Sequence, residues 1–457
     1  MTRRGLLIVI VIVIVSASAA CGGDDVRPRA ELMDPMTCAQ CHPKHHAEWA
    51  SSMHAYAGDD PVFLAMNKLG QEETGGALGD FCVRCHAPIA LAEGLTTDGT
   101  NLPDVPAWAK GVTCYFCHNA VEVTGEHNAP IRLANDQTMR AGLRDPIASP
   151  AHHTAYSPLL DATKGTSSAL CGSCHDIVTP AGVHLERTYA EWKTTIFADP
   201  DPRKQLSCGA CHMVATTDVI AEGPGFTAPL RDFGRREHTF AAIDVALTPW
   251  PDPARQQAAI DRDLRALLVG RLCVLPVDGG RIDYRLDNVG AGHFFPSGAT
   301  IDRRAWIEIV AYDAAGAVVY ASGKMPDADP LVDPEDLGDP DLWRLDTAAR
   351  DAGGQRTEKF WAVATLDHPG SLLGPAVTTD PNDPRFYHAV ERSFPVPGLL
   401  PQIERVTARA LIRPLPMKLL GDLFASGHLA VDLRSRLPTH QVGAMLEWHR
   451  GGTDCVQ

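Results

Sequence analysis

The sequence lacks a hydrophobic run long enough to cross a lipid bilayer. Its longest unbroken apolar run is residues 6–15, whereas a membrane-spanning helix needs about 20 apolar residues. Arg3 and Arg4 precede this run and small residues follow it at positions 16–20, which is the pattern of a secretory leader. We therefore predict that residues 1–20 are a signal peptide and that the mature chain is exported.

Cys21 follows the small residues directly and is itself followed by two glycines and two aspartates. This arrangement resembles a bacterial lipoprotein signal, in which the cysteine is acylated and becomes the mature N-terminus. We expect lipidation at Cys21, a polar tether over residues 21–35, and a location on the periplasmic or cell-surface side of a bacterial membrane. The alternative is ordinary cleavage after Ala19 or Ala20 without a lipid.

Basic residues are also scarce in this chain. Lysine and arginine number 41 against 56 aspartates and glutamates, so the formal net charge is −15. Such a charge repels polyanionic partners, and we expect no nucleic acid partner. The 457 residues are otherwise ordinary, with 45% hydrophobic and 21% charged, which is enough for two or three globular domains.

Ten of the thirteen cysteines fall in one repeated motif, Cys-x-x-Cys-His. The motif is the signature of covalent haem c attachment: the two thiols add to the porphyrin vinyl groups, and the next residue becomes the proximal iron ligand. We predict five covalently bound haem c groups. The five motifs are Cys38, Cys41 and His42; Cys82, Cys85 and His86; Cys114, Cys117 and His118; Cys171, Cys174 and His175; and Cys208, Cys211 and His212.

Two other chemistries use paired cysteines, namely structural zinc sites and disulfides. Neither requires a histidine directly after the second cysteine. Histidine makes up 19 of the 457 residues, so five such neighbours would arise by chance with a probability of roughly 10⁻⁷. The sequence therefore favours haem. The remaining pair, Cys273 and Cys455, forms either a disulfide or two free thiols.

Several segments resemble the multihaem cytochromes related to the tetrahaem cytochrome c-554 of nitrifying bacteria. The resemblance covers roughly residues 37–242 and rests on the first motif followed by Glu48, Trp49 and His54, and on the contexts of the third, fourth and fifth motifs. It implies distal iron ligands at His54, His152 and His238, with His153 as the competitor of His152. The resemblance does not transfer haem by haem, because this chain has five motifs and the namesake has four.

A further candidate ligand lies outside the motif-bearing part of the chain. His293 stands between Gly292 and Pro296, and a similar glycine-flanked turn follows the haem region in other multihaem cytochromes that the chain resembles. The resemblance implies a distal ligand that reaches across a domain interface. The alternative is a loop histidine held by backbone hydrogen bonds. The fifth distal ligand is left open between His127, His184 and none.

The motif-bearing segment, residues 36–245, offers only 27 to 52 residues between successive motifs. Such short gaps cannot build a conventional core, so we expect a pentahaem domain of helices and loops in which the porphyrins are the apolar filling. Pro43 directly after His42 predicts a helix leaving the first motif. Asp252 and Pro253 predict the start of a second helix, which we expect to end at Gly270 within a linker over residues 246–270.

Residues 271–415 show the alternation of apolar and polar residues that is typical of half-buried strands. Examples are Ile282, Tyr284 and Leu286, and the two runs that flank a turn at residues 313–316. The pattern predicts a β-sandwich-like domain, followed by a helical segment over residues 416–457. The predicted fold class is therefore α+β.

Two functions fit these features. The first is electron transfer through closely packed low-spin haems with two histidine ligands each, in which case the partners are redox proteins of unknown identity. The second is a multihaem reductase in which one haem keeps an open face for nitrite, hydroxylamine or a sulfur oxyanion. No proximal histidine is replaced by lysine in any of the five motifs, so the sequence favours the electron carrier and predicts no catalytic residue.

Overall fold

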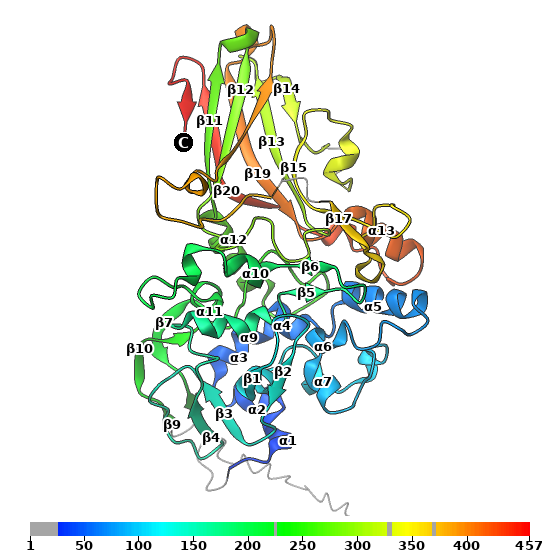
Figure 1. The fold of residues 1–457 in the computed structure, drawn as a ribbon, viewed down its shortest axis with the longest axis vertical. Coiled ribbons are helices and arrows are strands. Elements are labelled where there is room, and N and C mark those ends of the chain that lie inside the picture. The colour runs from blue at the N-terminus through cyan, green and yellow to red at the C-terminus, as the bar shows by residue number, and fades with distance from the viewer. Residues whose placement is uncertain (1–25, 224–225, 327–330, 368–371) are drawn as a thin grey trace, which may run out of the picture.

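The computed structural model describes residues 26–223, 226–326, 331–367 and 372–457. The molecule is elongated, with the five motifs at one end and a β-rich domain at the other (Figure 1). We call residues 26–251 the motif region and residues 252–456 the sandwich domain. The predicted α+β class is confirmed. The predicted signal peptide, Cys21 and the first residues of the tether lie outside the described residues.

The motif region consists mainly of short helices and loops, as expected. Most helices have four or five residues, and the longest has 13. Within the described residues no helix is long and apolar enough to cross a membrane. The helices are α1 (Arg29–Leu32), α2 (Pro35–Ala39), α3 (Pro43–Ala50), α4 (Met53–Tyr56), α5 (Pro61–Glu73), α6 (Val83–His86), α7 (Pro88–Ala92), α8 (Cys114–His118), α9 (Ser168–Gly172), α10 (Thr188–Trp192) and α11 (Cys208–His212).

Capping residues fix where the motif helices begin. The side chains of Thr113 and Ser207 accept hydrogen bonds from the backbone N–H groups of Phe116 and Ala210, at the starts of α8 and α11. Such caps satisfy N–H groups that have no partner inside the helix. Both helices consequently begin at the first cysteine of a motif. That first cysteine and the histidine of the same motif lie about one helical turn apart.

Five two-stranded sheets connect the helices of the motif region, and within the described residues they do not merge into a larger sheet. All are antiparallel except β3 with β4. The pairs are β1 (Ala120–Val123) with β2 (Ile131–Leu133), β3 (Thr138–Ala141) with β4 (His153–Tyr156), β5 (Ile177–Val178) with β6 (His184–Glu186), β7 (Ala215–Val219) with β10 (Leu230–Arg236), and β8 (Glu222–Gly223) with β9 (Phe226–Thr227).

The motif region also has an apolar cluster of its own, which the short gaps did not predict. Its buried members include Val83, Tyr115 and Phe116, which are the residues between the cysteines of the second and third motifs. Residues of the attachment motifs therefore form part of the apolar core of the motif region.

The helix predicted at Pro253 is α12 (Pro253–Arg265), and the Asp252 side chain caps it by accepting from the Arg255 N–H at 3.0 Å. It ends earlier than expected. Gly270 does not terminate a helix but lies inside strand β11 (Leu268–Leu275). A Cβ at this position would approach the Tyr284 hydroxyl oxygen to 3.0 Å, so the glycine serves close packing between strands.

The predicted β-sandwich is present as two antiparallel sheets. The four-stranded sheet has the order β18-β12-β11-β21, and the five-stranded sheet has the order β14-β13-β19-β20, with β15 paired to β13. The small pair β16 (Ala348–Arg350) and β17 (Thr365–Asp367) lies outside both. The sandwich strands after β11 are β12 (Arg281–Asn288), β13 (Arg304–Tyr312), β14 (Val318–Ser322), β15 (Trp343–Leu345), β18 (Val390–Pro395), β19 (Arg405–Arg413), β20 (His440–His449) and β21 (Cys455–Val456).

Both sheets contribute to one core. Leu272 and Ile282 from the four-stranded sheet meet Ile307 and Ala408 from the five-stranded sheet, and all four are fully buried. Ile282, Tyr284 and Leu286, the alternating apolar residues of β12, are all buried in this core, as the pattern predicted.

Residues 416–457 differ from the expected helical segment. This segment contains one α-helix, α13 (Met417–Ala425), and a short 3-10 helix at Arg434–Arg436. Helix α13 packs against α5 of the motif region. Strands β20 and β21 then complete the two sheets. A bulge at Gly443, where φ is +68°, interrupts the alternation along β20, which is why the pattern did not reveal this strand. Cys273 and Cys455 form a disulfide that joins β11 to β21.

Candidate haem-binding sites

The attachment cysteines of different motifs lie next to one another. The thiols of Cys38 and Cys114 share a hydrogen bond, which lowers the pKa of Cys38 and raises that of Cys114. The same contact joins Cys85 to Cys174, and Cys171 to Cys208. Cys117 in turn interacts electrostatically with Cys171. The first, third, fourth and fifth motifs are thus neighbours in that order, and the second motif lies beside the fourth.

The proximal histidines are oriented by the backbone. The Nδ1 atoms of His42, His86, His118 and His212 contact the carbonyl oxygens of Ile220, Ala57, Arg140 and Ala241 at 2.5–3.2 Å. In a neutral imidazole that donates from Nδ1, the other ring nitrogen, Nε2, carries the free lone pair. Metal-bound histidines are commonly fixed in this way, so these four residues present a metal-binding nitrogen toward the interior.

Three histidines outside the motifs face proximal histidines. The ring centres of His42 and His152 are 6.3 Å apart, those of His54 and His175 are 6.3 Å apart, and those of His118 and His238 are 6.2 Å apart. Two imidazoles on opposite sides of one iron have ring centres about 6 Å apart, because each metal–nitrogen bond is about 2 Å long. The three residues that the family resemblance implied are therefore each placed opposite a different motif.

The donor groups are also in the right chemical form. Burial lowers the pKa of His54 and His238 to about 3, and that of His86 and His293 to about 4. These rings are therefore neutral at physiological pH, which is the form that binds a metal. The residues present fit covalently attached haem with histidine ligands.

The structure also distinguishes His152 from its neighbour. Nδ1 of His152 contacts the carbonyl oxygen of His153 at 3.0 Å, and its ring lies against that of His42, whereas the His153 side chain is exposed. His152 is accordingly the member of this pair that faces a motif.

His293 lies on the sandwich domain and is half-buried where its loop contacts the motif region. The backbone N–H of Phe294 and the hydroxyl of Ser297 both donate to the Glu191 carboxylate of α10, at 3.1 and 2.7 Å. Gly292 has a φ of +67°, which favours glycine. His293 Nδ1 contacts the Phe294 carbonyl oxygen at 2.8 Å, and His212 is a near neighbour that helps to lower the pKa of His293. The loop that carries His293 therefore contacts the motif region across the interface, and ligation by His293 stays a prediction.

Other histidines of the sandwich domain are engaged differently. The Nε2 atoms of His440, His428 and His388 contact the Ile243 carbonyl oxygen, the Glu72 carboxylate and the Asn288 carbonyl oxygen at 3.0, 3.0 and 3.3 Å. These contacts occupy the nitrogen that an iron ligand needs, whereas His293 uses Nδ1.

His86 of the second motif has a different neighbour from the other proximal histidines. The ring packed against it is that of Phe63, with centres 4.0 Å apart and planes nearly parallel. His127 and His184 lie next to each other, with ring centres 6.2 Å apart. His127 also lines a cavity of about 460 Å³ beside Arg84, a residue of the second motif. The structure does not bring either histidine opposite His86 in the manner of the three pairs.

The zinc alternative finds no matching geometry in the described part of the chain, where no three His, Cys, Asp or Glu side chains are grouped as a metal-ion site.

Three residues near the sites were not predicted. His45 is half-buried, with its ring centre 4.9 Å from that of His238, and Glu48 and Arg235 form a buried ion pair. Glu48 lies inside the segment that carried the family resemblance, but its partner could not be identified from spacing.

Comparisons with known proteins agree with this picture. The family model described as cytochrome c554 and c-prime matches residues 37–119, which hold three of the five motifs. A penta-heme cytochrome c552 from Thermochromatium tepidum has the same fold, with a TM-score of 0.63 and 19% sequence identity over 93% of this chain and 100% of that chain. Among curated proteins no significant match is found.

The chain therefore shares the fold of a penta-heme cytochrome, and its five motifs have the pattern of covalent haem c attachment. Its likeness to the cytochrome c554 and c-prime family covers the segment that begins at Thr37 and contains the first three motifs.

Proposed function

We propose that this protein is an exported pentahaem cytochrome that transfers electrons through closely packed, low-spin haems with two histidine ligands each. The observation that carries the proposal is the set of three histidine pairs with ring centres 6.2–6.3 Å apart. In this assignment His152, His54 and His238 are the distal partners of His42, His175 and His118. His293 is the distal partner of His212.

The chain's own residues account for the electron-carrier assignment. When bound, haem c supplies an iron that changes oxidation state by one electron. Histidines on both sides of an iron leave no coordination position for a substrate. The thiol contacts place the attachment sites of the first, third, fourth and fifth motifs next to one another, which supports a continuous path with the second motif as a branch.

A second candidate function rests on the surroundings of His86. Among the described residues, the ring paired with His86 is that of Phe63, stacked on its face, and no histidine ring is paired with it at about 6 Å. The second motif is therefore the place where an iron would keep an open face. A reductase acting on nitrite, hydroxylamine or a sulfur oxyanion would use this position.

Low-temperature EPR of the complete holoprotein separates the two functions. If a fifth distal histidine also binds the second motif's iron, the holoprotein gives only low-spin ferric signals and binds no carbon monoxide, whereas one high-spin, carbon-monoxide-binding haem identifies the reductase site. Each of His54→Ala, His152→Ala and His238→Ala should add one high-spin haem, and His153→Ala should add none. Distal variants that leave every iron low-spin would contradict the assigned pairs.

Export and anchoring form a separate part of the proposal. The leader pattern before Cys21 supports a lipid-anchored protein on the periplasmic or cell-surface side, with redox proteins as partners. Cys21→Ala should move the protein from the detergent fraction to the soluble fraction, because the lipid chains supply the membrane affinity. Unchanged partitioning would exclude Cys21 as the anchor.

A further inference from the structure

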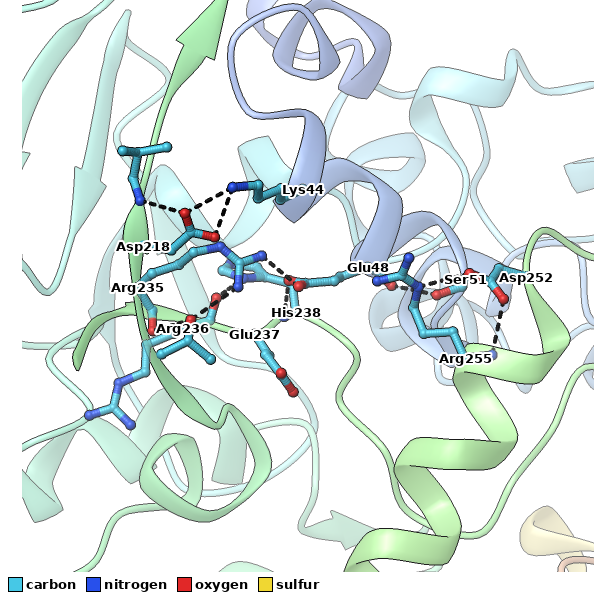
Figure 2. Close-up of polar contacts among 12 residues, drawn as sticks. Lys44, Glu48, Ser51, Asp218, Arg235, Arg236, Glu237, His238, Asp252 and Arg255 are labelled. Carbon is cyan, nitrogen blue, oxygen red and sulfur yellow. Dashed lines mark hydrogen bonds and ion pairs between the residues drawn. The ribbon is translucent and has the colours of Figure 1, made fainter. Parts of the chain in front are cut away.

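Glu48 is a buried carboxylate that makes contact with two different segments of the chain. It lies on α3, the helix that begins directly after His42, and only 7% of the residue is exposed. Figure 2 shows its side chain pointing at Arg235 and at the backbone of His238. Arg235 comes from β10 and is 4% exposed. The two charges are therefore paired in the interior.

Each carboxylate oxygen of Glu48 has its own donor. Oε1 accepts from Nη2 of Arg235, and Oε2 accepts from the backbone N–H of His238 at 3.0 Å. The other terminal nitrogen of Arg235, Nη1, donates to Thr216 Oγ1 on β7 at 3.2 Å. The carboxylate thus joins α3 to the end of the β7–β10 hairpin, where His238 follows.

These contacts fix the position of the His238 ring. The backbone N–H is held by Glu48, and Nδ1 contacts the Arg236 carbonyl oxygen at 2.9 Å. With both groups held, Nε2 remains as the free ring nitrogen. The ring lies 6.2 Å from that of His118, with the planes only 14° apart.

A buried ion pair is a weak source of stability, because desolvation of the two charges offsets their attraction. The Glu48–Arg235 pair is nevertheless buried, and it contacts the backbone of a histidine that faces a motif. A contrasting pair lies one turn earlier on the same helix: Lys44 donates to Asp218 of β7 at 2.8 Å, and its side chain is 44% exposed. Both pairs join α3 to the same hairpin, but only one touches His238.

We propose that Glu48 and Arg235 are a positioning pair that holds His238 as the distal ligand of the third motif's haem. The inference rests on the proposed function, in which His238 is that ligand. Because α3 starts at the residue after His42, the pair also connects the proximal side of the first motif to the distal side of the third.

The test uses the full-length holoprotein with Glu48→Gln. A glutamine at position 48 keeps one acceptor oxygen, so it can accept from His238 or from Arg235 but not from both, and its amide then faces another donor. We expect five attached haems by mass, and a changed EPR signal and reduction potential for one haem only. In Glu48→Ala, which loses both contacts, that haem should become partly high-spin and bind carbon monoxide, up to one equivalent per chain.

Two further variants serve as the reference and the control for this test, His238→Ala and Lys44→Gln. His238→Ala identifies the haem in question, and Lys44→Gln breaks the exposed pair and should leave all haem signals at their wild-type values. The proposal is overturned if Glu48→Gln leaves every signal unchanged, or changes a haem other than the one opened by His238→Ala. If Glu48→Gln does not retain its haems, Arg235→Lys is judged by the same criterion. If His238→Ala itself opens no haem, the ligand assignment fails and not merely the positioning role.

Discussion

The two regions of the molecule fill their interiors in different ways. In the sandwich domain, strands of up to ten residues supply one cluster of buried aliphatic and aromatic side chains from both sheets. In the motif region, most helices have four or five residues, and the interior contains imidazole rings and cysteine thiols that face one another. Neutral imidazoles without a partner are costly to bury.

This difference separates a domain whose core consists of side chains from a region whose interior fits the haems of the proposed function. The apolar cluster of the motif region contains residues from inside two motifs, Val83, Tyr115 and Phe116, so it forms around the attachment sites. The docked loop at His293 then connects the two regions. Each prediction below would break or sharpen this contrast.

The largest effect is expected when haem attachment is prevented at all five motifs. The motif region should lose its protection against hydrogen exchange, because its imidazoles and thiols then have no bound group to contact. The sandwich domain should keep its protection, because its core is made of side chains alone. Hydrogen-exchange mass spectrometry of the full chain measures the protection of both regions. Strong protection of α2, α6 and α8 without haem would show that the motif region folds without the bound groups.

Ile307→Ala tests the opposite region. Ile307 is fully buried in the sandwich core, and a buried Ile-to-Ala change lowers the free energy of unfolding by about 2–5 kcal/mol. Denaturant unfolding followed by tryptophan fluorescence should show this loss, while the EPR signals of the three proposed histidine pairs stay unchanged. Altered signals from those pairs would mean that the two regions fold as one cooperative unit.

Removal of the Cys273–Cys455 disulfide should have a somewhat smaller effect. The bridge closes a loop with a sequence separation of 182, and loss of a disulfide typically lowers the free energy of unfolding by about 2–4 kcal/mol. The double variant Cys273→Ser with Cys455→Ser is compared with the wild type by thermal unfolding. An unchanged midpoint would show that β21 is held in the sheet without the bridge.

The smallest effect per unit of pH is expected at the junction of the two regions. Burial raises the pKa of Asp302 from about 4 to about 7, so the folded protein holds this proton more tightly than the unfolded chain does. The stability that the proton contributes is complete below pH 4 and is lost as the pH rises to about 7, with a slope of at most about 1.4 kcal/mol per pH unit. Asp302→Asn should flatten this slope in denaturant titrations between pH 4 and 7, and an unchanged slope would exclude Asp302 as its source.

The sequence predicted the parts of the fold that have a local cause. Pro43 after His42 indicated α3, Asp252 with Pro253 indicated α12, and alternation indicated β12 and the two strands around the turn at residues 313–316, β13 and β14. Strand β20 was missed because its bulge at Gly443 breaks the alternation. The end of α12 was predicted at Gly270, but this glycine lies in strand β11, where it allows close packing against Tyr284 of the neighbouring strand. A contact between strands leaves no pattern in the local sequence from which it could be predicted.

The candidate sites divide in the same way. The five motifs are local patterns and were read directly, and the positions of His54, His152 and His238 followed from a family resemblance. Which motif each of them faces depends on the folded arrangement, and so does the pairing of Glu48 with Arg235 across more than 180 positions of the chain. Residues so far apart in the sequence share no periodic pattern from which their contact could be predicted.

The contacts between thiols of different motifs also imply an order of events during biogenesis. In an oxidising compartment, two thiols within hydrogen-bonding distance are two thiols that can be oxidised to a disulfide. Cys38 with Cys114, Cys85 with Cys174, and Cys171 with Cys208 would then cross-link one motif to another and block both. Under the proposed function, thioether bonds that form before the chain compacts would consume these thiols and prevent the cross-links.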